Sequence, residues 1–168
     1  MQFAKDSFYI ALRERLQSLN PSRTIERNGV SRPAILVAEN ELPSSAPRSL
    51  DAYYIEFGEV VPTKSQGEQP LMCMECFLWY QTQGDSESAI DRGRKLGLLD
   101  LDLMAICEPP YARKRNFLVS PSADLGTGIF WSTPVLEAAK ERAMVDGSRQ
   151  IERWARVLLY FYAEVIPQ

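Results

Sequence analysis

The chain has 168 residues and contains no histidine. Histidine is the most frequent general base, the usual partner of a serine or cysteine nucleophile and the commonest metal ligand. Its absence disfavours most hydrolase and metalloenzyme mechanisms. We therefore predict that the protein is not an enzyme and that it holds no catalytic residues, no metal and no cofactor.

The sequence also lacks an excess of positive charge and any long apolar run. Lysine and arginine total 19 against 22 aspartate and glutamate residues, which leaves a net charge of −3. General binding to nucleic acid or to an acidic membrane needs a basic excess, and a membrane-spanning helix needs about 20 apolar residues. Met1 is not followed by the apolar core of a signal peptide. We expect one domain, made in the cytoplasm and not associated with a membrane.

Cysteine is scarce, with Cys73, Cys76 and Cys107 as its three instances. The first two have the C-x-x-C spacing of some redox and zinc sites. However, the run 71–82 has the pattern of a strand, in which side chains three apart point to opposite faces. Without histidine, three cysteines cannot complete the tetrahedral nitrogen and sulfur ligand set of zinc. We expect buried, reduced thiols that pack as small apolar residues.

The spacing of apolar residues predicts two long helices and several strands. Phe8, Leu12 and Leu16 recur at every fourth position, which predicts an amphipathic helix over 4–19. A similar spacing predicts a second helix over 87–107, with a kink near Gly97 or a division there into two. Continuous or alternating apolar residues predict strands at 34–38, 52–61, 71–82, 127–132 and 156–166.

These elements predict an α+β fold in a single domain, 1–168. Each helix has one apolar stripe to bury, and two layers around one core are the usual solution. We therefore expect one mixed, mainly antiparallel β-sheet of about four to five strands, with the helices packed on one face. The stretch 108–154 is expected to be an irregular insertion, in which Pro134 begins a short helix that ends before Asp146-Gly147.

Two acidic residues and one glycine pattern are interpreted as structural features and not as parts of a catalytic or cofactor site. Asp100 and Asp102 are two apart, which on a helix separates them around the axis and favours a solvated face over an acid–base pair. The G-x-G at 126–128 lacks the third glycine and the preceding strand of a dinucleotide site, which favours a turn.

Two polar segments are candidates for contact with a partner. Arg113, Lys114 and Arg115 form the sharpest cluster of charge, expected on an exposed loop. They are either solvated, as most such residues are, or contact a phosphate backbone or an acidic partner in a weak, salt-dependent manner. The second segment, 62–70, has no large apolar residue and is expected to be an exposed hairpin tip. Its candidate contact residues are Lys64, Gln66 and Glu68.

Four sequence segments carry a family resemblance. They are R-P-A-I-L-V-A-E at 32–39, Y-I-E-F-G-E at 54–59, C-F-L-W-Y at 76–80 followed by Gly84, and D-R-G-R-K-L-G-L-L-D at 91–100. With these four segments in this order, the chain resembles the tail terminator, or tail completion, proteins of long-tailed phages and prophages.

The resemblance implies a structural protein of virion assembly. It implies a homo-oligomer, a hexameric ring that caps the tail tube, ends its polymerisation and joins it to the head. The implied partners are tail-tube and head-completion proteins, with a possible passing contact with DNA. The implied location is the cytoplasm of a bacterial host during assembly and then the virion tail. The long loop expected at 108–126 and the helix expected within 134–154 depart from the family layout.

A different class of function stays open beside this one. The protein could be a monomeric small-ligand binding protein or an enzyme, with a pocket near the 108–133 loop. Tyr111, Arg113, Arg115 and Trp131 lie close together in this part of the sequence. Such a set is suited to an anionic, planar ligand.

Overall fold

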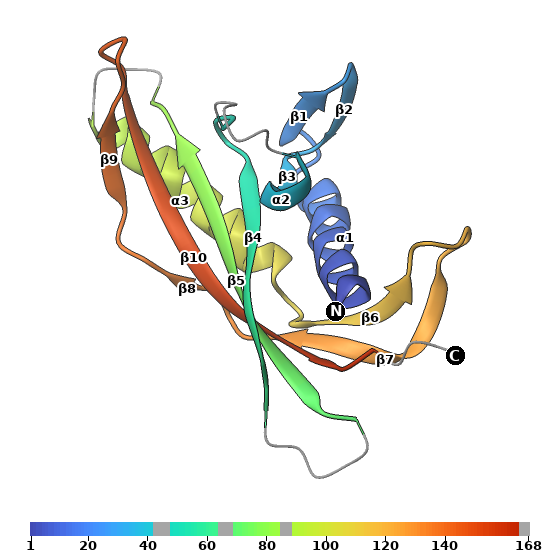
Figure 1. Ribbon diagram of the computed structural model, residues 1–168. Coiled ribbons are helices and arrows are strands. Elements are labelled where there is room, and N and C mark those ends of the chain that lie inside the picture. Colours follow the sequence, from blue (N-terminus) through green and yellow to red (C-terminus); the bar gives the residue numbers. More distant parts are fainter. Residues whose placement is uncertain (42–47, 64–68, 85–88, 165–168) are drawn as a thin grey trace.

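The computed structural model describes residues 1–41, 48–63, 69–84 and 89–164 (Figure 1). The fold is α+β, as predicted. Its helices are α1 (Gln2–Leu19), the short α2 (Ala38–Glu41) and α3 (Ala89–Ile106). Its strands are β1 (Thr24–Arg27), β2 (Val30–Pro33), β3 (Ile35–Val37), β4 (Tyr53–Pro62), β5 (Leu71–Thr82), β6 (Tyr111–Asn116), β7 (Ala123–Trp131), β8 (Val135–Leu136), β9 (Lys140–Ala143) and β10 (Arg149–Tyr162).

Within the described residues, eight strands form one large, curled, mixed sheet in the order β3-β4-β5-β10-β7-β6, with β8 and β9 also paired to β10. Strands β3 and β4 are parallel and the other pairs are antiparallel. The prediction of a mixed, mainly antiparallel sheet is confirmed. The predicted number of strands, four to five, is wrong, because the stretch 108–154 adds four strands and the first part of β10. Strands β1 and β2 form a separate hairpin that was not predicted.

The expected helix after Pro134 is absent. Strand β10 begins at Arg149, and its first residues pair with β9 and β8. The connection between β9 and β10 contains Asp146-Gly147, and Gly147 has φ +84°, a conformation that glycine adopts readily. Asp-Gly between two extended segments is a strong hairpin signal. The helix-favouring residues of 135–143 are therefore held extended by the neighbouring strand. The second predicted helix, by contrast, is one continuous helix, α3.

The main core lies on one face of the sheet, which we call the core face. Alternate residues of β4, β5, β7 and β10 point into it, together with one side of α1 and one side of α3. Phe8 of α1, for example, packs edge-on against Trp131 of β7 at 5.2 Å between ring centroids. The other members include Leu12, Leu16, Met74, Cys76, Leu78, Leu96, Leu99, Leu103, Ile129, Val157, Leu159 and Phe161.

Polar contacts fix the two long helices in place. Asp100 of α3 accepts a hydrogen bond from the Tyr80 hydroxyl at 2.6 Å and pairs with Arg153 of β10 at 3.0 Å. Asp102 accepts from Asn20 and Arg23, at the end of α1 and just after it, at 2.9 and 2.7 Å. The interpretation of these aspartates as a solvated face is therefore wrong. Each one ties α3 to another part of the fold.

The described residues cover the opposite face of the sheet, the open face, at one end only. There Tyr54 and Trp79 form a second small cluster with Leu36, and Ile25 of β1 packs against it. The guanidinium of Arg48 lies 4.5 Å from the centre of the Trp79 ring and pairs with Glu56 at 2.6 Å. Such a cation over an aromatic face is attractive. The described segment that leads into β4 is thus pinned to this end of the sheet.

Candidate functional site

The three cations of the basic cluster lie on strand β6 and not on a loop. Successive side chains of a strand point to opposite faces, so the cluster is divided. Arg113 and Arg115 are exposed, whereas Lys114 is only 4% exposed. The expectation of three exposed cations is therefore wrong for Lys114.

Arg113 and Arg115 differ in their surroundings. Arg113 pairs with Asp124 of β7 at 2.6 Å, and this hydrogen bond holds the pKa of the Asp124 carboxyl below its usual value. The backbone N–H of Arg115 donates a hydrogen bond to the Ser7 hydroxyl of α1 at 2.9 Å, while the Arg115 side chain is exposed. Together the two arginines line one side of a cavity of about 320 Å³ between α1 and β6.

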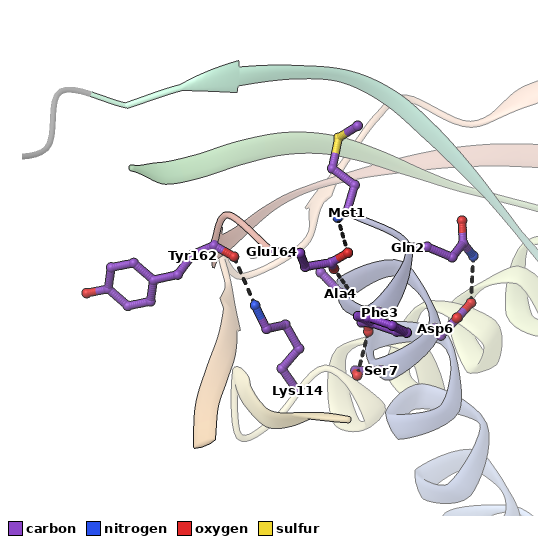
Figure 2. A network of polar contacts seen from close by, with 9 residues as sticks. All are labelled: Met1, Gln2, Phe3, Ala4, Asp6, Ser7, Lys114, Tyr162 and Glu164. Carbon is purple, nitrogen blue, oxygen red and sulfur yellow. Dashed lines mark hydrogen bonds and ion pairs between the residues drawn. The ribbon is translucent and has the colours of Figure 1, made fainter. Parts of the chain in front are cut away.

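Lys114 belongs to a polar network at the start of α1 (Figure 2). Its Nζ donates a hydrogen bond to the backbone oxygen of Tyr162 at 2.9 Å. Glu164 lies nearby, but its carboxylate is engaged by the Met1 amino group and by the Ala4 backbone N–H. Burial lowers the pKa of Lys114, and the negative charge of Glu164 partly opposes this.

The residues proposed for an anion pocket do not all come together. Trp131 is buried in the core, and its indole N–H donates to the backbone oxygen of Cys107 at 2.8 Å. Tyr111 lies on the open face, where its ring contacts Phe130 at 5.1 Å between centroids. Gly128 leaves room for it, because a Cβ there would lie 2.3 Å from the Tyr111 ring. Of that set, the two arginines share a cavity and the two aromatic residues are elsewhere.

A row of apolar side chains crosses the open face. Pairing between the strands places Tyr111 beside Phe130, Phe130 beside Tyr160, Tyr160 beside Cys73 and Cys73 beside Val61. These residues come from five different strands, and we call them the aromatic row. Phe130 is 47% exposed, and Tyr111 and Val61 are exposed to a similar degree. No described element covers the row. An exposed apolar patch of this kind is a candidate contact surface.

A second apolar patch lies on the outward side of α3, which we call the outer stripe. It consists of Ile90, Leu98 and Leu101, and Leu101 is 67% exposed. The inward side of the same helix packs into the core. The outer stripe and the aromatic row therefore lie on opposite sides of the protomer. The alternation of aromatic residues along the strands indicated apolar side chains on both faces of the sheet, but it did not show which of them stay exposed.

The two closely spaced cysteines lie on opposite faces of β5, as predicted. Cys76 is buried in the core, and Cys73 belongs to the aromatic row. Among the described residues, no group of three or more cysteine, aspartate or glutamate side chains is placed to hold a metal ion. None of the described helices is long and apolar enough to cross a membrane. Lys64, Gln66 and Glu68 lie outside the described residues.

Comparison with known proteins adds no assignment. Neither a protein-family model nor a curated protein matches the sequence.

Proposed function

We propose that the protein is a structural subunit of virion assembly, similar to a tail terminator, which forms a ring through repeated contacts between identical protomers. The observation that carries this proposal is the aromatic row, an uncovered apolar strip across five strands. Aromatic residues are enriched at the centres of protein interfaces. In this proposal α1 and α3 form one layer on the core face and leave the other face for contact.

The position of the outer stripe favours a ring over a symmetric dimer. A closed ring uses two different surfaces, so that one patch of each protomer meets another patch of its neighbour. A two-fold dimer buries the same patch on both copies. The aromatic row and the outer stripe lie on opposite sides of the protomer, which is the arrangement that head-to-tail contact requires. The hexameric state, and tail-tube and head-completion proteins as partners, follow from the family resemblance.

Arg115 is the residue that we assign to contact with passing DNA or with an acidic partner. Its side chain is exposed, whereas Arg113 is already paired with Asp124 and Lys114 is buried. One such cation on each protomer gives a ring of positive charge in an otherwise acidic assembly, which provides electrostatic complementarity to a phosphate backbone.

The proposal is tested by two charge substitutions on opposite sides of the protomer. Phe130→Glu places a charge in the aromatic row, and Leu101→Glu places one in the outer stripe. Light scattering of the wild-type protein over a range of concentrations is expected to show an oligomer, and each variant alone a monomer. Val145→Glu is the matched control, because Val145 is fully exposed in the turn between β9 and β10. It is expected to leave the oligomer intact.

Mixing the two variants distinguishes head-to-tail contact in a ring from a two-fold dimer. If the contact is head-to-tail, each variant keeps one intact patch, and the mixture forms a one-to-one pair that cannot grow further. A wild-type protein that stays monomeric at high concentration, alone and with tail-tube subunits, would contradict the proposal. Recovery of a full-size assembly from the mixture would contradict the pairing of these two patches.

A further inference from the structure

The core face of the sheet continues beyond the first turn of α1, and a second cavity of about 230 Å³ lies there. Its polar wall contains Lys114 and Asn116 of β6, Thr127 of β7 and Glu164 after β10, and its apolar wall contains Phe3 and Leu125. Gln69, before β5, also lines the cavity, so five separate segments meet around one small space. This cavity is distinct from the one that Arg113 and Arg115 line.

Two polar groups of this cavity are left with unused hydrogen-bonding capacity. The ammonium of Lys114 has three protons, and the described residues accept one of them, through the backbone oxygen of Tyr162. The hydroxyl of Thr127 is buried and has no hydrogen-bond partner among the described residues. Buried polar groups in proteins are nearly always paired, and each exception calls for an explanation.

Among the described residues, Lys114 also forms no ion pair. Its side chain is 4% exposed, and a buried ammonium is costly without an anion beside it. Glu164 is the nearby carboxylate, but its oxygens are engaged by the first residues of α1. An additional anion in the cavity would satisfy Lys114 and Thr127 together.

We propose that this cavity binds a small carboxylate on a short apolar stem. Its oxygens accept hydrogen bonds from Lys114 Nζ and the Thr127 hydroxyl, and its stem lies against Phe3 and Leu125. A single negative charge fits best, because one lysine is available and Glu164 repels a dianion. The source is a free small molecule or the carboxylate at the end of a polypeptide chain. The inference does not depend on the ring proposal.

The test is a titration of the full-length protein followed by the backbone amide NMR signals of 114 and 127. The probes are butyrate for a free carboxylate and N-acetyl-leucine for a chain end, with butyramide as the uncharged control and sodium chloride at equal ionic strength. Saturable shifts with either carboxylate, absent with butyramide, are expected. The probe that binds more tightly identifies the source.

Three variants decide whether Lys114 and Thr127 hold the ligand. Lys114→Met keeps the apolar stem and is expected to weaken binding at least tenfold, because a hydrogen bond to a charged group is lost. Thr127→Val keeps the shape of the side chain and is expected to weaken binding severalfold, which keeps the test decisive if Lys114→Met does not fold. Arg113→Met removes an exposed cation from the same strand and is expected to change nothing. Equal binding by all variants, or wild-type shifts no larger than those with sodium chloride, would overturn the proposal.

Discussion

Neighbouring residues of strand β7 illustrate how differently the two faces of the sheet are used. Ile129 is fully buried on the core face, whereas Phe130, the next residue, is 47% exposed on the open face. Both are large and apolar, and both lie in the same strand. Composition alone therefore does not say which of them stabilises the monomer. The layer of helices on the core face makes that distinction.

The polar contacts of the core face also differ from those of the open face. On the core face, the Tyr53 hydroxyl donates to the backbone oxygen of Leu99 at 2.7 Å, and Tyr80 donates to Asp100. These bonds join the sheet to α3. On the open face, Arg156 and Glu75 form an ion pair of 3.6 Å in which both side chains are nearly half exposed. Exposed pairs of this kind contribute little to stability. The core face thus holds the fold together, and the open face is available for contact.

The largest expected difference between the faces is in stability. We predict that Ile129→Ala lowers the free energy of unfolding by about 2 to 5 kcal/mol, because it leaves a cavity in a closely packed core. Phe130→Thr, one residue along, keeps a strand-favouring side chain and is expected to cost less than about 1 kcal/mol in the monomer. Urea unfolding of both variants measures the two values. Similar losses for the two variants would contradict the division of the faces.

The second prediction concerns the tyrosines of the core face in alkaline solution. Burial raises the pKa values of the Tyr53 and Tyr80 hydroxyls, and the bond to Asp100 raises that of Tyr80 further. The unfolded chain therefore releases these protons as the pH rises above about 10, while the folded chain keeps them. Stability is fully present below pH 10 and falls above it, by about 1.4 kcal/mol per pH unit for each tyrosine.

Tyr53→Phe tests this dependence directly. At pH 7 the variant loses one hydrogen bond, which costs about 0.5 to 1.5 kcal/mol. Above pH 10 its stability is expected to fall with a slope smaller by about 1.4 kcal/mol per pH unit than that of the wild-type protein. Urea unfolding at several pH values from about 8 to about 11, a range that includes the ordinary pKa of tyrosine, measures the slope of stability against pH for both proteins. An unchanged slope would show that the Tyr53 hydroxyl is not protected from solvent.

Sequence patterns predicted the parts of this fold in which local signals and long-range packing agree. The alternation along β4 and β5, and the spacing of Phe8, Leu12 and Leu16, each match the face that is buried. The patterns failed at 135–143, where helix-favouring residues are held extended by pairing with β10. The hairpin that β9 forms with β10 is local, but β10 is itself held by its long pairing with β5, and helix propensity is weak against such pairing.

The site was less predictable than the fold. The cluster 113–115 was singled out by charge, but its division depends on the strand that contains it, and that strand was expected to be a loop. Thr127 gave no signal at all, since a lone threonine in a strand is unremarkable. The aromatic row is visible only once the register of five strands is known, because its members are scattered between Val61 and Tyr160.

The smallest expected effect distinguishes the faces without changing stability. Cys76 and Cys107 are buried on the core face, and burial raises the pKa of the Cys107 thiol to about 12 and that of Cys76 well above its ordinary value. Because the thiolate is the reactive form, both are expected to resist alkylation in the folded protein. Cys73 lies in the aromatic row, is partly exposed and is expected to react first. Brief treatment with iodoacetamide at pH 8, followed by peptide mass spectrometry, measures the three thiols separately.

Unfolding in urea should make all three thiols react alike, and assembly through the aromatic row should protect Cys73. Preferential labelling of Cys76 or Cys107 in the folded monomer would contradict the assignment of the core face.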